Sequence, residues 1–168
     1  NKPQMVENNS IPTRIALPFP AHIPEEYVPY LPSRLSLYRR LINVNSVEAI
    51  NSIREELFDR FGGLPSTVEN LLYLTGIKLV ATEACIEAIF QSKSELVFTL
   101  CEPLDGDKTI FVKSLVGDIR TGNRNLYMSP CEDVIQLKSR ILDVVKALKN
   151  WVDLGSRGAS DMSDHGSD

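Results

Sequence analysis

The chain has 168 residues, of which 43% are hydrophobic and 24% charged, and its formal net charge is −4 at pH 7. These values are typical of one soluble globular domain with tails, and no apolar run approaches the roughly 20 residues of a membrane-spanning helix. The acidic balance argues against a domain built mainly to bind nucleic acid.

The N-terminal part of the chain predicts a linker, a strand and an extended segment. Residues 1–12 are mostly polar and carry neither a secretory signal nor an initial methionine, so we expect a linker from domains upstream in a longer chain. Residues 13–19 are a candidate strand. The prolines that follow keep the backbone extended as far as Pro32, because proline disfavours helix in the residue before it.

Three amphipathic helices are predicted next. We expect Ser33 to cap the first helix and Asn45 with Glu48 to form a capping box at the start of the second. The second helix should end at Phe61, because the two glycines after it can adopt the left-handed conformation, and the third should start near residue 65. The side chains expected to face inward are Leu35, Tyr38, Leu41 and Ile42 from the first helix, and Val47, Ile50, Ile53, Leu57, Phe58 and Phe61 from the second.

After residue 84 the apolar pattern changes from helical spacing to alternation. This change predicts a hairpin over residues 86–100, with a polar break at 92–94. A helix (108–119), a third strand (125–129) and a long helix (132–152) follow, and residues 154–168 have too few apolar side chains to order, so we expect a disordered acidic tail. The predicted fold is α+β, with helices packed around a small antiparallel β-sheet that the strand at 13–19 can join.

Nothing in the sequence points to catalysis. His22 and His165 have no cysteine, histidine or carboxylate at metal-ligand spacing, and there is no phosphate-binding loop, dinucleotide fingerprint or nucleophile elbow. The three cysteines, Cys85, Cys101 and Cys131, are odd in number and widely spaced, which favours reduced, buried or half-buried thiols in a cytoplasmic protein. We therefore expect no catalytic residue, metal or cofactor in this domain.

Two charged faces remain as candidate sites. Arg34, Arg39 and Arg40 line the first helix, where they form either a solvated face or a contact for phosphate. On the second helix, at about 100° per residue, five polar side chains fall opposite the apolar stripe: Glu48, Ser52, Glu55, Glu56 and Asp59. This acidic face is either solvated or a docking site for basic residues of a partner.

Two motifs give the chain a family resemblance. The first is IPEEYVPYLPSRLSLYRRL at residues 23–41 and the second is EELFDRFGGLP at residues 55–65. Both resemble, in order and spacing, motifs of the C-terminal domain of bacterial transcription-repair coupling factors. The resemblance covers residues 14–88, and from residue 89 onward it depends on the order of the elements. It implies that residues 13–153 are a C-terminal regulatory domain.

The resemblance also implies a role. The whole protein would be a DNA translocase that removes stalled RNA polymerase and recruits nucleotide excision repair, with ATP and Mg²⁺ bound by motor domains upstream. This domain would fold back on the N-terminal module of the same polypeptide, which resembles the excinuclease B subunit, and would mask the surface that binds the excinuclease A subunit, UvrA. The acids placed at that contact, facing arginines, correspond to Glu56 and Asp59, and Glu55 makes the strip more acidic.

Two functional hypotheses follow, and both treat this domain as non-enzymatic. In the first, the domain is an autoinhibitory interaction module that docks through Glu56, Asp59 and Glu55 and reaches UvrA, RNA polymerase and DNA only through the whole protein. In the second, it is a nucleic-acid-binding accessory module that uses Arg34 and its neighbours on the first helix. Neither hypothesis involves a membrane.

Overall fold

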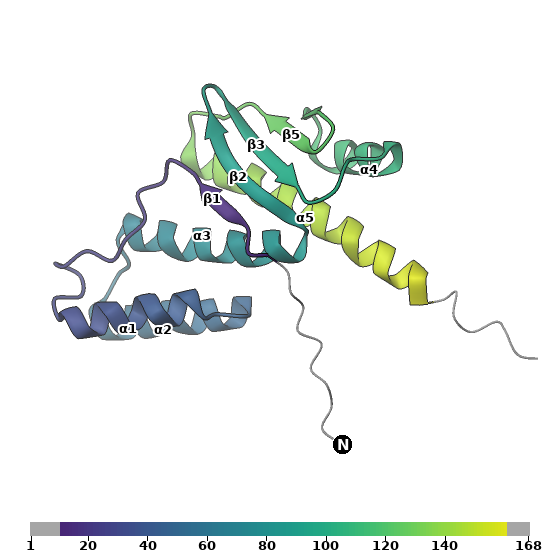
Figure 1. Cartoon of the computed structure of the whole chain (residues 1–168). Helices are drawn as coiled ribbons and strands as arrows, with labels where there is room; N and C mark the ends of the chain where they lie inside the picture. Colours follow the sequence, from purple (N-terminus) through teal and green to yellow (C-terminus); the bar gives the residue numbers. More distant parts are fainter. Residues whose placement is uncertain (1–10, 161–168) are drawn as a thin grey trace, which may run out of the picture.

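The computed structural model describes residues 11–160 (Figure 1), so most of the predicted linker, the residues beyond 160 and His165 lie outside the described residues. The elements in chain order are β1 (Arg14–Ala16), α1 (Leu31–Ile42), α2 (Val47–Phe61), α3 (Ser66–Glu83), β2 (Ile86–Ser92), β3 (Glu95–Leu100), α4 (Gly106–Val116), β4 (Arg120–Thr121), β5 (Asn125–Met128) and α5 (Val134–Ser160). The predicted α+β class is confirmed.

The strands form one sheet in the order β1-β2-β3-β5-β4. β2 and β3 form the predicted antiparallel hairpin, while β1 pairs with β2 in parallel, with Ile15 opposite Ile89. The sheet is therefore mixed, not wholly antiparallel as predicted. The physical reason is that three helices separate β1 from β2, and a crossover of that length allows two strands to run in the same direction.

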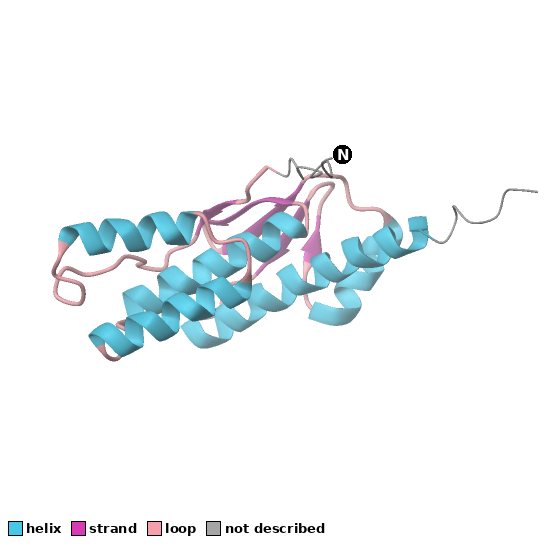
Figure 2. Cartoon of the chain, turned by 90° about the horizontal axis from the view of Figure 1, so that it is seen from below, coloured by secondary structure: helices cyan, strands magenta, loops and turns pink. Residues whose placement is uncertain are grey.

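The helices build two layers beside the sheet. α3 and α5 pack against each other and cover one face of the sheet, and α1 and α2 lie on the far side of α3 (Figures 1 and 2). Two apolar clusters result. One joins the sheet to α5 and to Ile77 and Ala81 of α3, and the other joins α1 and α2 to Val68 and Leu72 of α3. α3 thus lies between the α1–α2 pair and the sheet and contributes side chains to both clusters.

Two helix starts differ from the prediction. α1 begins at Leu31, before the predicted cap Ser33, with Pro32 in its first turn, where the fixed φ of proline suits a helix. α2 is capped by Ser46 instead of Asn45, because the extended Ser46 accepts a hydrogen bond from the backbone N–H of Ala49 at 3.2 Å.

The inward faces are narrower than predicted. On α1 the buried side chains are Leu37 and Leu41, whereas Leu35 and Ile42 are exposed. On α2 the buried side chains are Ile50, Ile53 and Leu57, whereas Val47 and Phe58 are exposed. Each helix contacts the rest of the fold along a single stripe, and a residue about 100° away from that stripe reaches solvent.

The C-terminal helix continues past the predicted end at residue 152. Gly155 and Gly158 each weaken a helix by about 1 kcal/mol relative to alanine, but neither breaks the backbone ladder as proline does. The short strand β4 was not predicted, since two residues show no alternation. Within residues 11–160 the structure contains no helix that is both long enough and apolar enough to cross a membrane.

Candidate interaction surface

The C-terminal end of α2 is fixed by a tyrosine from the proline-rich segment. Gly62 ends the helix with a φ of 84°, which favours glycine. The hydroxyl of Tyr27 donates to the carbonyl of Gly62 at 2.9 Å and lies 3.1 Å from that of Leu57. Its ring also packs on Phe61, with ring centroids 5.7 Å apart. These contacts hold the last turn of α2 at a defined angle to the loop that follows.

The acids of α2 divide into two groups by their contacts. Glu55 and Asp59 line one groove together with Phe58, whereas Glu56 pairs with Arg40 and Arg60. The structure therefore brings Glu55 and Asp59 together beside Phe58 and separates both from Glu56, although all three acids were predicted to form one strip.

Glu56 faces α1 and is held there by two arginines. Its carboxylate oxygens lie 2.7 Å from the guanidinium nitrogens of Arg40, on α1, and of Arg60, one turn along α2. The hydrogen bond from Arg40 is the main cause of a lowered Glu56 pKa. Partial burial opposes it, and Arg60 lowers the pKa further. Glu56, which was predicted to point outward, thus forms ion pairs within the domain, and its pair with Arg40 joins α1 to α2.

Glu55 and Asp59 instead line an open groove. The groove has a volume of about 500 Å³ and is bounded by Arg54, Glu55, Phe58, Asp59, Leu64 and Glu69. Arg54 and Glu69 form an ion pair that connects α2 to α3 along its edge. Among the described residues, Glu55 and Asp59 have no ion-pair partner of their own. The groove therefore presents two free carboxylates beside apolar surface.

Phe58 is one of the predicted core residues that reach the surface. It was expected in the core, but 59% of it is exposed and it forms part of the groove wall. A signal was present in the sequence, because Phe58 lies about 100° from Leu57 and so falls at the margin of the apolar stripe. An exposed aromatic side chain is a candidate binding residue, because aromatic residues are enriched in interface cores.

The arginines of α1 are largely engaged inside the domain. Arg34 donates to the carbonyls of Val28 and Pro29, at 2.7 and 3.1 Å, and Arg40 is paired with Glu56. Arg39 is exposed and makes no ion pair within residues 11–160. The three arginines therefore do not form one free basic patch.

No metal centre accompanies these surfaces. Within the described part of the chain, no three histidine, cysteine, aspartate or glutamate side chains come together closely enough to hold an ion. The groove offers charge and apolar surface without an activated nucleophile. Its chemistry suits binding of a segment that carries a cation next to an apolar side chain.

Sequence comparison gives a match over the part of the chain that contains the groove. A family model described as the TRCF domain matches residues 17–108. The transcription-repair-coupling factor of Bacillus subtilis (strain 168) is 32% identical over 100 residues, which cover 57% of this chain and 8% of that protein. The corresponding protein of Rickettsia bellii (strain RML369-C) is 30% identical over 137 residues, which cover 70% of this chain and 12% of that protein. The chain thus spans only a small part of these relatives.

Structural comparison gives the same fold. A crystal structure of the C-terminal domain of transcription-repair coupling factor superposes with a TM-score of 0.73, covering 82% of this chain and 91% of that one. The sequence identity in that superposition is 15%, so the likeness establishes a shared fold.

Proposed function

The chain belongs to the TRCF domain family, and on that premise we propose that it is a regulatory interaction domain whose α2 groove docks on another module of the same polypeptide. The family match includes both motifs from which the resemblance was inferred, at residues 23–41 and 55–65, so that resemblance is confirmed. The docking role itself is our proposal.

The observation that carries the proposal is the groove beside Phe58. Among the described residues, Asp59 and Glu55 have no ion-pair partner, and Phe58 offers an exposed ring in the same groove. An arginine from the partner can pair with a carboxylate and stack on the ring at the same time, because guanidinium is planar and weakly hydrated. This combination favours a cationic partner over an anionic one.

The structure suggests different roles for the three acids that the resemblance implicates. Glu56 is neutralised by Arg40 and Arg60, so a partner arginine would have to compete with both. Asp59 and Glu55 face no such competition. We therefore assign partner contact to Asp59, Glu55 and Phe58, and we assign to Glu56 the task of holding α1 against α2 so that the groove keeps its shape.

The partner that we propose is the N-terminal module of the whole protein. Relatives of this chain are named transcription-repair-coupling factors. In the proposed cycle, docking masks the surface of that module that binds UvrA, and the domain is released when the motor upstream, with its ATP and Mg²⁺, engages RNA polymerase and DNA. A close interfacial charge pair contributes roughly 1–3 kcal/mol, so a few such contacts keep the closed state dominant yet reversible.

The test uses the whole protein and its affinity for UvrA. Phe58→Ala combined with Asp59→Ala should weaken closure. Each loss of about 1.4 kcal/mol in closure raises the open fraction, and hence the affinity for UvrA, about tenfold while the closed state dominates. An unchanged affinity in this double variant means that the groove is not the latch.

Glu48→Gln is the matched control. It removes one negative charge from the same helix, at the end away from the groove. We expect this variant to leave the affinity for UvrA unchanged. An equal rise in both variants would show that the helix acts through its overall charge and not through the groove.

A further inference from the structure

Two of the three cysteines meet at the open end of the β2–β3 hairpin. Ile86 of β2 pairs with Leu100 of β3, so the next residues outward, Cys85 and Cys101, lie opposite each other. The backbone N–H of Cys101 donates to the carbonyl of Cys85 at 3.0 Å. Cys85 and Cys101 are sixteen positions apart in sequence, but the hairpin brings them next to each other.

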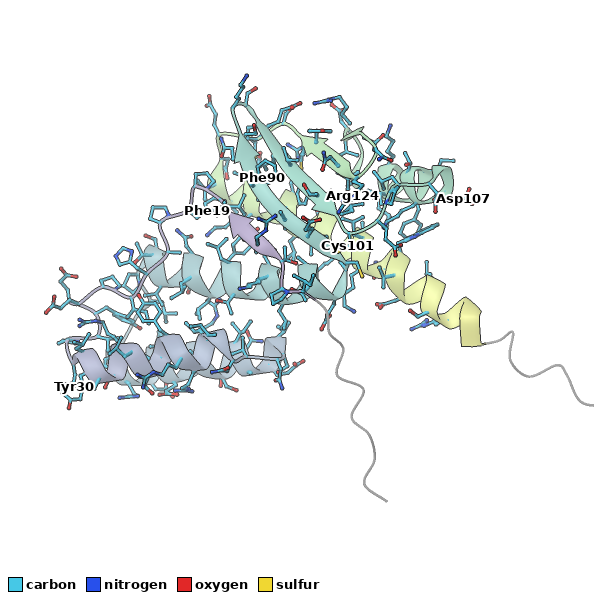
Figure 3. The ribbon with its side chains drawn as sticks, in the orientation of Figure 1. Phe19, Tyr30, Phe90, Cys101, Asp107 and Arg124 are labelled. Atoms are coloured by element: carbon cyan, nitrogen blue, oxygen red, sulfur yellow. The ribbon has the colours of Figure 1, made fainter. Side chains whose placement is uncertain are left out.

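The backbone separation suits a disulfide. The adjacent ladder pair, Ile86 and Leu100, is directly opposed, and such residues of antiparallel strands have Cα atoms about 4.5–5.5 Å apart, while disulfides span Cα distances of about 4.4–6.8 Å. Both cysteines are exposed, contrary to the expectation of buried or half-buried thiols. Figure 3 labels Cys101 just beyond the end of β3.

We propose that Cys85 and Cys101 form an oxidisable dithiol, which a peroxide converts to an intramolecular disulfide. In the first step one thiolate attacks the peroxide, so that an S–O bond forms, the O–O bond breaks and the leaving oxygen departs as water or an alcohol. In the second step the other thiol attacks the resulting sulfenic acid, so that the S–S bond forms and the hydroxyl leaves as water. Two electrons pass from the sulfurs to the peroxide.

The surroundings of Cys101 disfavour its thiolate form. Partial burial, the adjacent Cys85 thiol and Glu87 raise the pKa of Cys101, and Arg124 opposes this effect while Glu102 adds to it. Arg124 is itself held close, because it donates to the carbonyl of Leu100 at 2.9 Å and pairs with Glu87 (Figure 3). A thiol that is mostly protonated reacts slowly with weak oxidants.

The disulfide would join two parts of the fold. Cys85 follows Ala84, the residue that caps α3, and adopts a φ of 55°, in the left-handed region. Cys101 directly follows β3 and leads toward α4. A bond between them would fix the end of α3 to the start of the α4 connection.

The test treats the whole 168-residue chain with hydrogen peroxide and maps its peptides without reduction. We expect the free thiols to fall from three to one, a single species in which the peptides of Cys85 and Cys101 are linked, and full reversal by dithiothreitol. Cys131 is the internal control, since its sulfur lies by the carbonyl of Asp133, away from the pair, and it should stay a thiol.

The variants Cys85→Ser and Cys101→Ser should each abolish the linked species, and Cys131→Ser should retain it. The proposal is overturned by linked peptides that involve Cys131, by disulfides between two chains, or by oxidation of the pair to sulfinic acid without a crosslink. Mapping of the unmodified chain requires no substitution, so its result stands even where a variant folds poorly.

Discussion

The ion pairs of Glu56 give a stability prediction that separates its role from that of the other acids. Glu56→Ala removes the contacts with Arg40 and Arg60, both at 2.7 Å. The Arg60 pair is an i,i+4 contact, for which about 0.3–0.5 kcal/mol is typical, and the partly exposed Arg40 pair adds about 0.2–1 kcal/mol. We therefore expect the free energy of unfolding to fall by about 0.5–1.5 kcal/mol.

The assay is urea unfolding of the 168-residue chain at low ionic strength and in about 1 M salt. A loss of 1 kcal/mol lowers the melting temperature of a domain of this size by about 2–4 °C, so a thermal scan provides a second measure. Salt at about 1 M shortens the screening length to roughly 3 Å, and the difference between variant and parent should shrink there. Glu55→Ala is the matched control, because it removes an adjacent acid that has no ion pair among the described residues.

Equal destabilisation by Glu55→Ala and Glu56→Ala would refute the role of the ion pairs, because the loss would then follow from charge or helix propensity alone. An unchanged unfolding midpoint for Glu56→Ala at low salt would refute it as well. In either case Glu56 would be free to meet a partner, and the division of roles among the acids would have to be abandoned.

Three further predictions follow. Folding lowers the Glu56 pKa from 4.5, so the stability that Glu56 adds is fully present above that value and is lost as pH falls through the folded pKa. The free energies of unfolding of Glu56→Gln and of the parent, measured by urea titration, should therefore converge at acid pH. Tyr27→Phe removes the hydroxyl that bonds the end of α2 and should cost about 0.5–1.5 kcal/mol in chemical unfolding. Since Arg34 and Arg40 are bonded inside the domain, the isolated chain should not bind duplex DNA even at low salt. Salt-dependent binding that is lost in Arg39→Ala would favour the nucleic-acid-binding module instead.

Much of the fold was predictable because its signals are local. The glycine pair after Phe61 ends α2 as predicted, and the polar break at 92–94 marks the turn between β2 and β3. The parallel pairing of β1 was not predictable in this way, because it depends on where three intervening helices return the chain. The continuation of α5 to Ser160 shows that weak helix formers alone do not fix a helix end.

Part of the geometry of the candidate site could be predicted from the sequence. The motif at 55–65 includes Glu55, Phe58, Asp59 and Leu64, which line the groove, and the outward direction of Asp59 follows from its spacing. The partners of Glu56 did not follow, because Arg40 lies on another helix and its approach depends on how α1 packs against α2. The exposure of Phe58 could not be predicted either, because it depends on which other elements pack against the edge of the apolar face of α2.

The most direct test of the central claim is the affinity of this chain for the separately produced N-terminal module of the whole protein, measured by calorimetry. Our account predicts binding that weakens at least about tenfold in Asp59→Lys, a loss of about 1.4 kcal/mol, and that also weakens in Phe58→Ala. Glu48→Gln should bind as the parent does. No binding by the parent chain, or equal binding by parent, Asp59→Lys and Phe58→Ala, would contradict the claim that the α2 groove is the docking surface.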